Sequence, residues 1–236
     1  MPHGGSVTSH HLVDLQEVLR APASAGAAVV SFDVDGTLYR MDSIRWRFLW
    51  RNRARLRAVR VGRAVREELR ETDFPDGAAL RAAEARLAAE RLEVPVERAR
   101  SVLDDIFGAS LVDVVARVGA GPGVRDGLQA LVRSGVSIAV ASDRPAQRKL
   151  VALGLFDLPW AAVICADDTG ALKPSARVLG AVARAAHCEP TQIIHVGDRV
   201  DTDGACAQNV GARFVLADAF WDACRRLPTS PDFERR

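Results

Sequence analysis

Short apolar runs and longer amphipathic segments alternate along most of the chain. Five runs are continuously apolar or β-branched at their central positions, which is typical of parallel strands that helices cover on both faces. These runs occupy residues 27–33, 136–142, 161–167, 192–198 and 212–218. Segments with helical spacing separate them, at residues 124–135, 144–154, 175–187 and 204–211. The alternation predicts an α/β fold with a doubly wound parallel sheet.

The alternation stops between residue 40 and about residue 120, where no strand-like run occurs. This region is rich in Ala, Arg, Leu and Glu, and residues 77–92 and 96–119 have helical periodicity. An all-helical insertion after the first strand fits this pattern, and the Gly and Pro residues of 119–124 predict the hinge back into the sheet. The expected parts are an N-terminal helix and link at 1–26, an α/β core at 27–41 and 120–236, and a helical cap at 42–119.

Composition is that of an ordinary globular protein. The chain has 236 residues, of which 48% are hydrophobic and 26% charged, and its formal net charge is +2. This balance gives no reason to expect a nucleic-acid partner. No run is long and apolar enough for a transmembrane helix, and the N-terminus does not resemble a secretory signal. The four cysteines form no C-x-x-C pair, which favours reduced thiols and a cytoplasmic location.

The charge distribution is uneven, because residues 43–70 contain ten arginines and two tryptophans. The first interpretation is a long helix with a solvated basic face. A second is that some arginines line the crevice and attract a small phosphorylated metabolite. A third, less favoured, is a basic amphipathic surface that contacts an anionic membrane or a partner. The sequence does not indicate an oligomeric state.

Polar residues gather where four of the five predicted strands end. They are Asp33-Val34-Asp35-Gly36-Thr37, Ser142-Asp143-Arg144, Asp167-Asp168 with Lys173-Pro174 nearby, and Gly197-Asp198 with Asp201 and Asp203. Ligands of open α/β sheets bind at the carboxyl ends of the strands, so we expect these clusters to converge on one crevice. Two neighbouring aspartates also raise each other's pKa, and we therefore expect a metal or an electrophilic substrate between Asp33 and Asp35.

The order of these motifs resembles the haloacid dehalogenase superfamily. The chain has D-x-D-G-T-L, an isolated Ser, Lys-Pro and G-D-x-x-x-x-D, each after a predicted strand. The resemblance covers residues 27–42 and about 122–220, and the helical insertion is similar to the C1-type cap of that family. It implies a doubly wound Rossmann-like core. The cap residues themselves indicate no subfamily.

The resemblance also implies a function, namely a Mg²⁺-dependent phosphatase that hydrolyses a small phosphomonoester through an aspartyl-phosphate. Asp33 is the expected nucleophile. Asp35 is the expected general acid for the leaving oxygen and then the base that activates water. Lys173 is expected to neutralise charge on Asp33 and on the phosphoryl oxygens. Thr37 and Ser142, together with Lys173, are expected to bind the phosphate.

The same resemblance implies a metal site. Mg²⁺ prefers hard oxygen ligands. The expected protein ligands are the carboxylates of Asp33 and Asp198 and the main-chain carbonyl of Asp35. Asp203 is expected to support this cluster as an outer partner, for example to Lys173. A metal that bridges nucleophile and phosphate would offset the repulsion between the two anions.

Other functions share parts of this pattern. A dehalogenase needs no Mg²⁺ and no carboxylate at position 35, so Asp35 argues against it. Phosphonate hydrolysis on this core uses a cap lysine, and residues 40–120 contain none. A sugar phosphomutase shares every core residue and stays open as an alternative. A catalytically silent binding protein also stays open, although Asp33, Asp35, Lys173 and Asp198 are all present.

Two further residues need an interpretation. Asp143 stands where many members of the family have Asn, and it brings negative charge to the phosphate side unless Arg144 or another cation compensates it. His195 lies inside the fourth predicted strand. We interpret it as a hydrogen-bonded histidine of the core rather than as a catalytic group.

Overall fold

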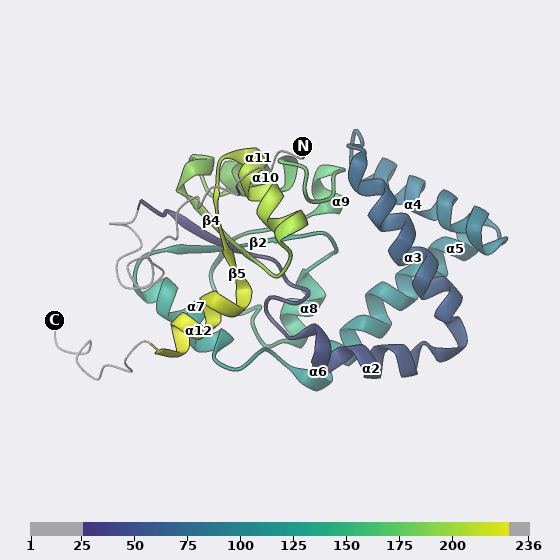
Figure 1. Cartoon of the computed structure of the whole chain (residues 1–236), viewed down its shortest axis with the longest axis horizontal. Helices are drawn as coiled ribbons and strands as arrows, with labels where there is room; N and C mark the ends of the chain where they lie inside the picture. Colours follow the sequence, from purple (N-terminus) through teal and green to yellow (C-terminus); the bar gives the residue numbers. More distant parts are fainter. Residues whose placement is uncertain (1–25, 227–236) are drawn as a thin grey trace, which may run out of the picture.

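A parallel five-stranded sheet forms the centre of the protein (Figure 1). The computed structural model describes residues 26–226, so the helix predicted near the N-terminus lies outside the described residues. The strands are β1 (Val29–Phe32), β2 (Ser137–Ser142), β3 (Trp160–Cys165), β4 (Ile193–Gly197) and β5 (Arg213–Leu216). Their order is β3-β2-β1-β4-β5. This topology confirms the predicted doubly wound α/β fold and places β1, with its two following aspartates, at the centre.

Helices cover both faces of this sheet. On one face lie α7 (Val124–Arg133) and α12 (Ala217–Arg226), and on the other lie α10 (Arg177–Ala185) and α11 (Ala205–Val210) (Figure 1). Shorter elements follow three of the strands: α8 (Gln147–Ala152) after β2, α9 (Ala166–Thr169) after β3 and η5 (Val200–Gly204) after β4. A further short helix, η4 (Pro190–Gln192), directly precedes β4. The strands end earlier than the apolar runs suggested, because Asp167 and Asp218 already belong to α9 and α12. No helix of the described residues is long and apolar enough to cross a membrane.

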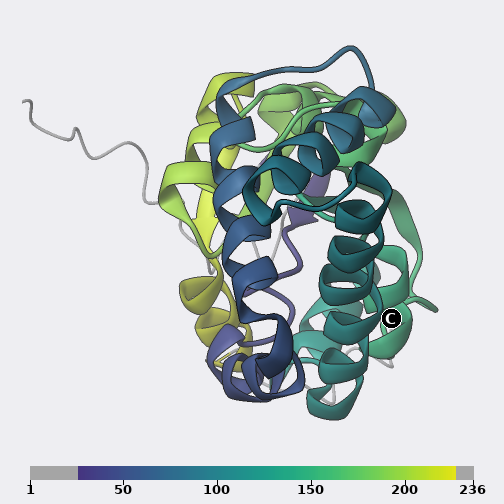
Figure 2. The ribbon, with the colours of Figure 1, turned by 90° about the vertical axis from the view of Figure 1, so that its right-hand side faces the viewer.

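All elements between β1 and α7 are helical. They are α2 (Met41–Arg51), η1 (Arg53–Arg55), α3 (Leu56–Glu68), η2 (Leu69–Glu71), α4 (Gly77–Leu92), α5 (Val96–Asp104), the π-helix η3 (Asp105–Ser110) and α6 (Leu111–Val118). Most of these helices stand together at one side of the sheet (Figure 1), and Figure 2 views the molecule from that side. We call this group the cap. It lies across the edge of the sheet at which the strands end.

The Arg-rich segment 43–70 is not one long helix, which corrects the first interpretation of that segment. It breaks at Asn52, whose backbone leaves the helical conformation at the end of α2. The Asn52 side-chain amide donates to the Phe48 carbonyl and to Ser110 Oγ, both at 2.9 Å. A tertiary contact with a residue 58 positions away therefore stabilises the corner between α2 and α3.

An aromatic cluster anchors β1 to the helical layer beneath it. The Phe32 ring lies 5.5 Å from the Trp221 ring in a stacked arrangement and 5.5 Å from the Phe220 ring in an edge-on arrangement. The Trp221 indole N–H also donates to the Thr37 carbonyl at 2.8 Å. Such pairs add to the free energy gained by burial. The cluster thereby fixes both β1 and the loop that carries the two aspartates.

Disruption of this aromatic cluster should lower the free energy of unfolding. Phe220 is fully buried, whereas Phe156 is 46% exposed. We expect Phe220→Ala to lower the free energy of unfolding by about 3–5 kcal/mol, since it removes a buried ring and leaves a cavity. Phe156→Ala makes the same chemical change and should cost less than about 1 kcal/mol. Urea denaturation of both variants measures the difference, and equal losses would contradict the importance of the cluster.

Candidate active site

The carboxyl ends of the strands and the cap enclose a cavity of about 370 Å³. Residues that follow β1, β2, α9 and β4, including two from η5, meet residues from α2, α3, η2, η3 and α6 there. Five of the predicted site residues line it: Asp33, Asp35, Lys173, Asp198 and Asp203. Polar residues from all four expected strand ends therefore converge on one crevice, but Asp167 and Asp168, which were expected there too, do not line it.

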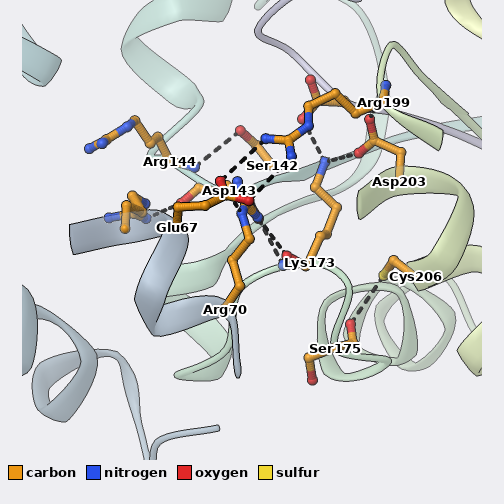
Figure 3. Close-up of polar contacts among 12 residues, drawn as sticks. Glu67, Arg70, Ser142, Asp143, Arg144, Lys173, Ser175, Arg199, Asp203 and Cys206 are labelled. Carbon is orange, nitrogen blue, oxygen red and sulfur yellow. Dashed lines mark hydrogen bonds and ion pairs between the residues drawn. The ribbon is translucent and has the colours of Figure 1, made fainter. Parts of the chain in front are cut away.

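Lys173 connects two of these carboxylates. Its Nζ lies 2.5 Å from Asp203 Oδ1 (Figure 3). The same Nζ lies 2.6 Å from Asp33 Oδ1 and donates to the Ala141 carbonyl at 3.0 Å. The lysine is 1% exposed. Although burial acts against it, the negative charges of Asp33 and Asp203 raise the pKa of Lys173. Lys173 is thus held as a cation next to the predicted nucleophile.

Negative charge is crowded around Asp33. Burial, together with the charges of Asp203 and Asp35, raises the pKa of Asp33 to about 8 despite the opposing charge of Lys173. Burial and the charge of Asp203 likewise raise the pKa of Asp198 to about 6. Asp203 has the opposite shift, because Lys173 and His195 outweigh burial and lower its pKa. The crowding favours binding of a further cation near Asp33 and Asp198.

The donor set fits a hard divalent cation. Asp33, Asp198 and Asp203 each place a carboxylate oxygen within 4.8 Å of the others. Asp198 approaches the loop after β1 closely, since a Cβ on Gly36 would lie 2.1 Å from Asp198 Oδ2. Gly36 also has a φ of +99°, which glycine adopts without strain. Asp33 and Asp198 are the residues that would hold Mg²⁺; the role of the Asp35 carbonyl stays a prediction.

Asp203 serves other partners in this structure. Its Oδ1 contacts Lys173, and its Oδ2 accepts the Arg199 main-chain N–H at 3.1 Å. His195 Nε2 lies 3.4 Å from Asp203 Oδ1, and His195 Nδ1 lies 2.9 Å from Ser31 Oγ. These contacts suit the supporting role expected for Asp203. They also place His195 in the core, where burial lowers its pKa and favours the neutral ring.

Asp35 has a cation of its own, which sequence reasoning missed. Lys149 Nζ, from α8, lies 2.6 Å from Asp35 Oδ1 and 2.5 Å from Oδ2, and the Tyr39 hydroxyl donates to Asp35 as well. Although burial acts against it, the charge of Lys149 holds the pKa of Asp35 below its usual value. The side chains of Asp33 and Asp35 therefore engage different ammonium groups. The composition could have pointed to Lys149, because Lys149 and Lys173 are the only lysines of the chain.

Asp143 is compensated by Lys173 of the core and by arginines of the cap, and its ion-pair partner is Arg70 rather than Arg144. Arg70 of η2 contacts Asp143 Oδ2 at 2.5 Å and also donates to the Lys173 carbonyl (Figure 3). Asp143 Oδ1 accepts the Lys173 main-chain N–H at 2.9 Å. Arg66 donates to the Asp143 carbonyl. Although burial opposes them, the charges of Lys173 and Arg70 keep the pKa of Asp143 low, so the unusual aspartate connects core and cap.

The two predicted hydroxyl ligands of phosphate lie beside the cavity but do not line it. Ser142 is 1% exposed, and its Oγ accepts the Arg144 main-chain N–H at 3.3 Å. Thr37 is 3% exposed, and its Oγ1 is buried without a hydrogen-bond partner among residues 26–226. Its main-chain N–H donates to the Val34 carbonyl at 3.3 Å. The free Thr37 hydroxyl is consistent with an absent oxygen ligand, and phosphate binding by both residues stays a prediction.

A double-mutant cycle can measure how much the Lys149–Asp35 pair contributes to the free energy of unfolding. Lys149→Met removes the counter-charge of a largely buried carboxylate and should lower the free energy of unfolding by about 3 kcal/mol. The double variant Lys149→Met/Asp35→Asn should lose less free energy of unfolding than the sum of the two single variants. The difference, which is the coupling free energy of the pair, should be about 1–3 kcal/mol. Urea denaturation without added metal measures the cycle.

The exposed pair Arg125–Asp157 provides the control for that cycle. Its side chains are 41% and 62% exposed. The cycle of Arg125→Met with Asp157→Asn should show much weaker coupling, since solvent screens exposed charges. Additive losses at Lys149 and Asp35 would contradict the importance of the buried pair.

Comparison with known proteins agrees with this geometry. The sequence profile of the haloacid dehalogenase-like hydrolase family matches residues 27–211. A search of curated proteins found no match. Among solved structures, 2-haloacid dehalogenase from Pseudomonas syringae pv. tomato DC3000 has a TM-score of 0.56 and 23% identity, over 80% of this chain and 86% of that one.

Two further structures have the same fold. β-Phosphoglucomutase from Clostridium difficile has a TM-score of 0.57 and 15% identity, over 80% of this chain and 83% of that one. CbbY from Rhodobacter sphaeroides, solved in complex with phosphate, has a TM-score of 0.52 and 20% identity, over 80% and 85% of the two chains. At these identities the likeness establishes the fold and not the reaction.

Proposed function

Because the chain belongs to the haloacid dehalogenase-like hydrolases, we propose that it is a Mg²⁺-dependent phosphatase that hydrolyses a small phosphomonoester. One observation carries the proposal. Two carboxylates that are one residue apart, Asp33 and Asp35, each have a buried lysine within 2.6 Å. A nucleophile and a separate proton-transfer group are what phosphate-ester hydrolysis through a covalent intermediate requires.

Displacement by Asp33 is the first chemical step. A carboxylate oxygen of Asp33 attacks phosphorus, and the bond from phosphorus to the leaving oxygen breaks. The step needs Asp35 in its protonated form, against which the charge of Lys149 acts. Protonated Asp35 gives its proton to that oxygen as the bond breaks, so the product leaves as an alcohol and Asp35 becomes ionised. Lys173 Nζ, 2.6 Å from Asp33 Oδ1, orients the nucleophile and offsets charge on the phosphoryl oxygens.

Hydrolysis of the aspartyl-phosphate is the second step. Asp35, now ionised, takes a proton from a water molecule whose oxygen attacks phosphorus. The bond from phosphorus to Asp33 breaks, which releases phosphate and restores the Asp33 carboxylate. Lys149 and Tyr39 hold the Asp35 carboxylate in place for both proton transfers. A Mg²⁺ ion bound by Asp33 and Asp198 supplies positive charge to the phosphoryl oxygens when present.

Two other reactions compete with this proposal. A dehalogenase has no need for a second, lysine-paired carboxylate, so the Asp35–Lys149 contact favours phosphate transfer over halide displacement. A mutase would use the same core residues and would return the phosphoryl group from Asp33 to a second hydroxyl. No contact in the cavity favours the mutase specifically, so hydrolysis by water is the simpler proposal.

The nucleophile assignment has a direct test. Purified protein with Mg²⁺ should release phenol from phenyl phosphate, and excess EDTA should stop the release. Asp33→Asn should abolish turnover while the far-ultraviolet circular dichroism stays that of the wild type, since the amide cannot form the acyl phosphate. Asp201→Asn is the matched control, because Asp201 is 68% exposed and pairs with Arg199 at the surface. Turnover by a folded Asp33→Asn variant would overturn the assignment.

The acid–base assignment has a separate test. Asp35→Asn should slow hydrolysis of phenyl phosphate by at least about 10²-fold. The loss should be smaller for para-nitrophenyl phosphate, because para-nitrophenolate leaves without needing a proton. Steady-state kinetics with both esters gives the comparison. Equal losses for the two esters would assign Asp35 a structural role and not proton transfer to the leaving oxygen.

A further inference from the structure

The cavity has two zones of different chemistry. The inner zone contains the carboxylates and Lys173 described above. A second part of the lining, which we call the apolar wall, comes from the cap, with Met41, Ile44, Phe48, Phe107 and Leu111. The Arg144 guanidinium lies over the Phe107 ring, 4.0 Å from its centroid. A phosphoryl group held near Asp33 would direct the rest of its molecule toward this wall. Unpaired hydroxyl groups would lose hydrogen bonds to water there, so the wall favours an apolar stem.

Six arginines line the same cavity, and four of them have acidic partners. Arg66 contacts Glu84 at 2.5 Å, and Arg144 lies 3.8 Å from the same glutamate. The other two pairs are Arg70 with Asp143 at 2.5 Å and Arg199 with Glu67 at 3.3 Å. Arg70–Asp143 and Arg199–Glu67 each join a cap residue to a core residue. These four arginines therefore already form ion pairs with acidic side chains of the protein itself.

Arg45 and Arg63 differ from the other four. Both line the cavity and both are exposed. Neither has an acidic side chain within 4.0 Å in the part of the chain that the structure describes. Arg45 follows Ile44 of the apolar wall on α2, and Arg63 lies one turn before Arg66 and Glu67 on α3. Two guanidinium groups without an acidic partner among residues 26–226 thus line the same cavity as the apolar wall.

We propose that Arg45 and Arg63 bind a second anionic group at the far end of the substrate. The substrate would then be a phosphomonoester with an apolar stem and a distal carboxylate or phosphate. Guanidinium groups suit both, because they donate two parallel hydrogen bonds to either oxyanion. A cavity of about 370 Å³ holds a molecule of this small size. This inference rests on the proposed phosphatase function.

Three esters of similar size test the inference: phenyl phosphate, 4-carboxyphenyl phosphate and its neutral analogue 4-carbamoylphenyl phosphate. Wild-type protein at physiological ionic strength should have a kcat/KM at least about tenfold higher for the carboxylate than for the carboxamide, as expected for charge-assisted hydrogen bonds. Most of the difference should lie in KM. A fourth ester, 1,4-phenylene bisphosphate, tells whether a distal phosphate is preferred over a distal carboxylate.

Variants assign the preference to the two arginines. Arg45→Gln and Arg63→Gln should each reduce the ratio of carboxylate to carboxamide kcat/KM several-fold, and the double variant should abolish the preference. Arg47→Gln and Arg60→Gln remove the same charge from the same helices, and neither residue lines the cavity. These controls should keep the wild-type ratio. An equal reduction in the controls would mean general electrostatic attraction and would overturn the inference.

The outcomes separate the inference from the proposed function. Hydrolysis of phenyl phosphate without a preference for the anionic esters would overturn the inference and leave the phosphatase in place. Failure to hydrolyse any of the four esters would count against the phosphatase. In that case calorimetric binding of 4-carboxyphenyl phosphate and of its carboxamide decides the inference separately. Tighter binding of the carboxylate, lost in the Arg45→Gln/Arg63→Gln variant, would support it, and equal binding would overturn it.

Discussion

Compensation of buried carboxylates by ammonium groups is the constraint on which this structure depends. An ionised carboxylate inside a protein is costly unless a partner of opposite charge lies next to it. The chain contains two lysines, and both are 1% exposed and paired with the aspartates that follow β1. An ammonium group is compact and points its protons in several directions, whereas a guanidinium is a planar fork. Lys173 uses this property to contact two carboxylates and a carbonyl at once.

The attachment of the cap follows from the same balance of charge. Lys173 donates its main-chain N–H to Asp143, and Asp143 in turn receives Arg70 from the cap. Arg70 also donates to the Lys173 carbonyl, so the loop that carries Lys173 contacts the cap directly. An asparagine at position 143 has one acceptor oxygen in place of two, so its amide N–H2 would replace the acceptor of one of these hydrogen bonds, and the Arg70 charge would lose its closest anion. The departure of this motif from the family pattern is therefore explained by a cap arginine far away in the sequence.

Sequence reasoning succeeded where the determinants are local. Alternation of apolar runs predicted the sheet, helical periodicity predicted α4, and motif spacing brought Asp33, Asp198 and Asp203 to one edge. It failed where the determinant is a distant contact. Asn52 ends α2 and donates a hydrogen bond to Ser110, and nothing within the Arg-rich segment indicates this contact. Lys149 is 114 residues from Asp35, and only the scarcity of lysine in the chain distinguishes it from a surface residue.

The two aspartates of the first motif show how the environment shifts the pKa values of identical groups in opposite directions. Burial and the neighbouring carboxylates raise the pKa of Asp33, whereas Lys149 holds the pKa of Asp35 low. The low pKa of Asp35 suits a base that takes a proton from water, whereas the raised pKa of Asp33 shows how much negative charge surrounds the proposed nucleophile. Asp33 has surplus negative charge around it and therefore gains most from a divalent cation. Asp35 already has its counter-charge in Lys149, so the proposed acid–base role requires no contact between its carboxylate and a metal.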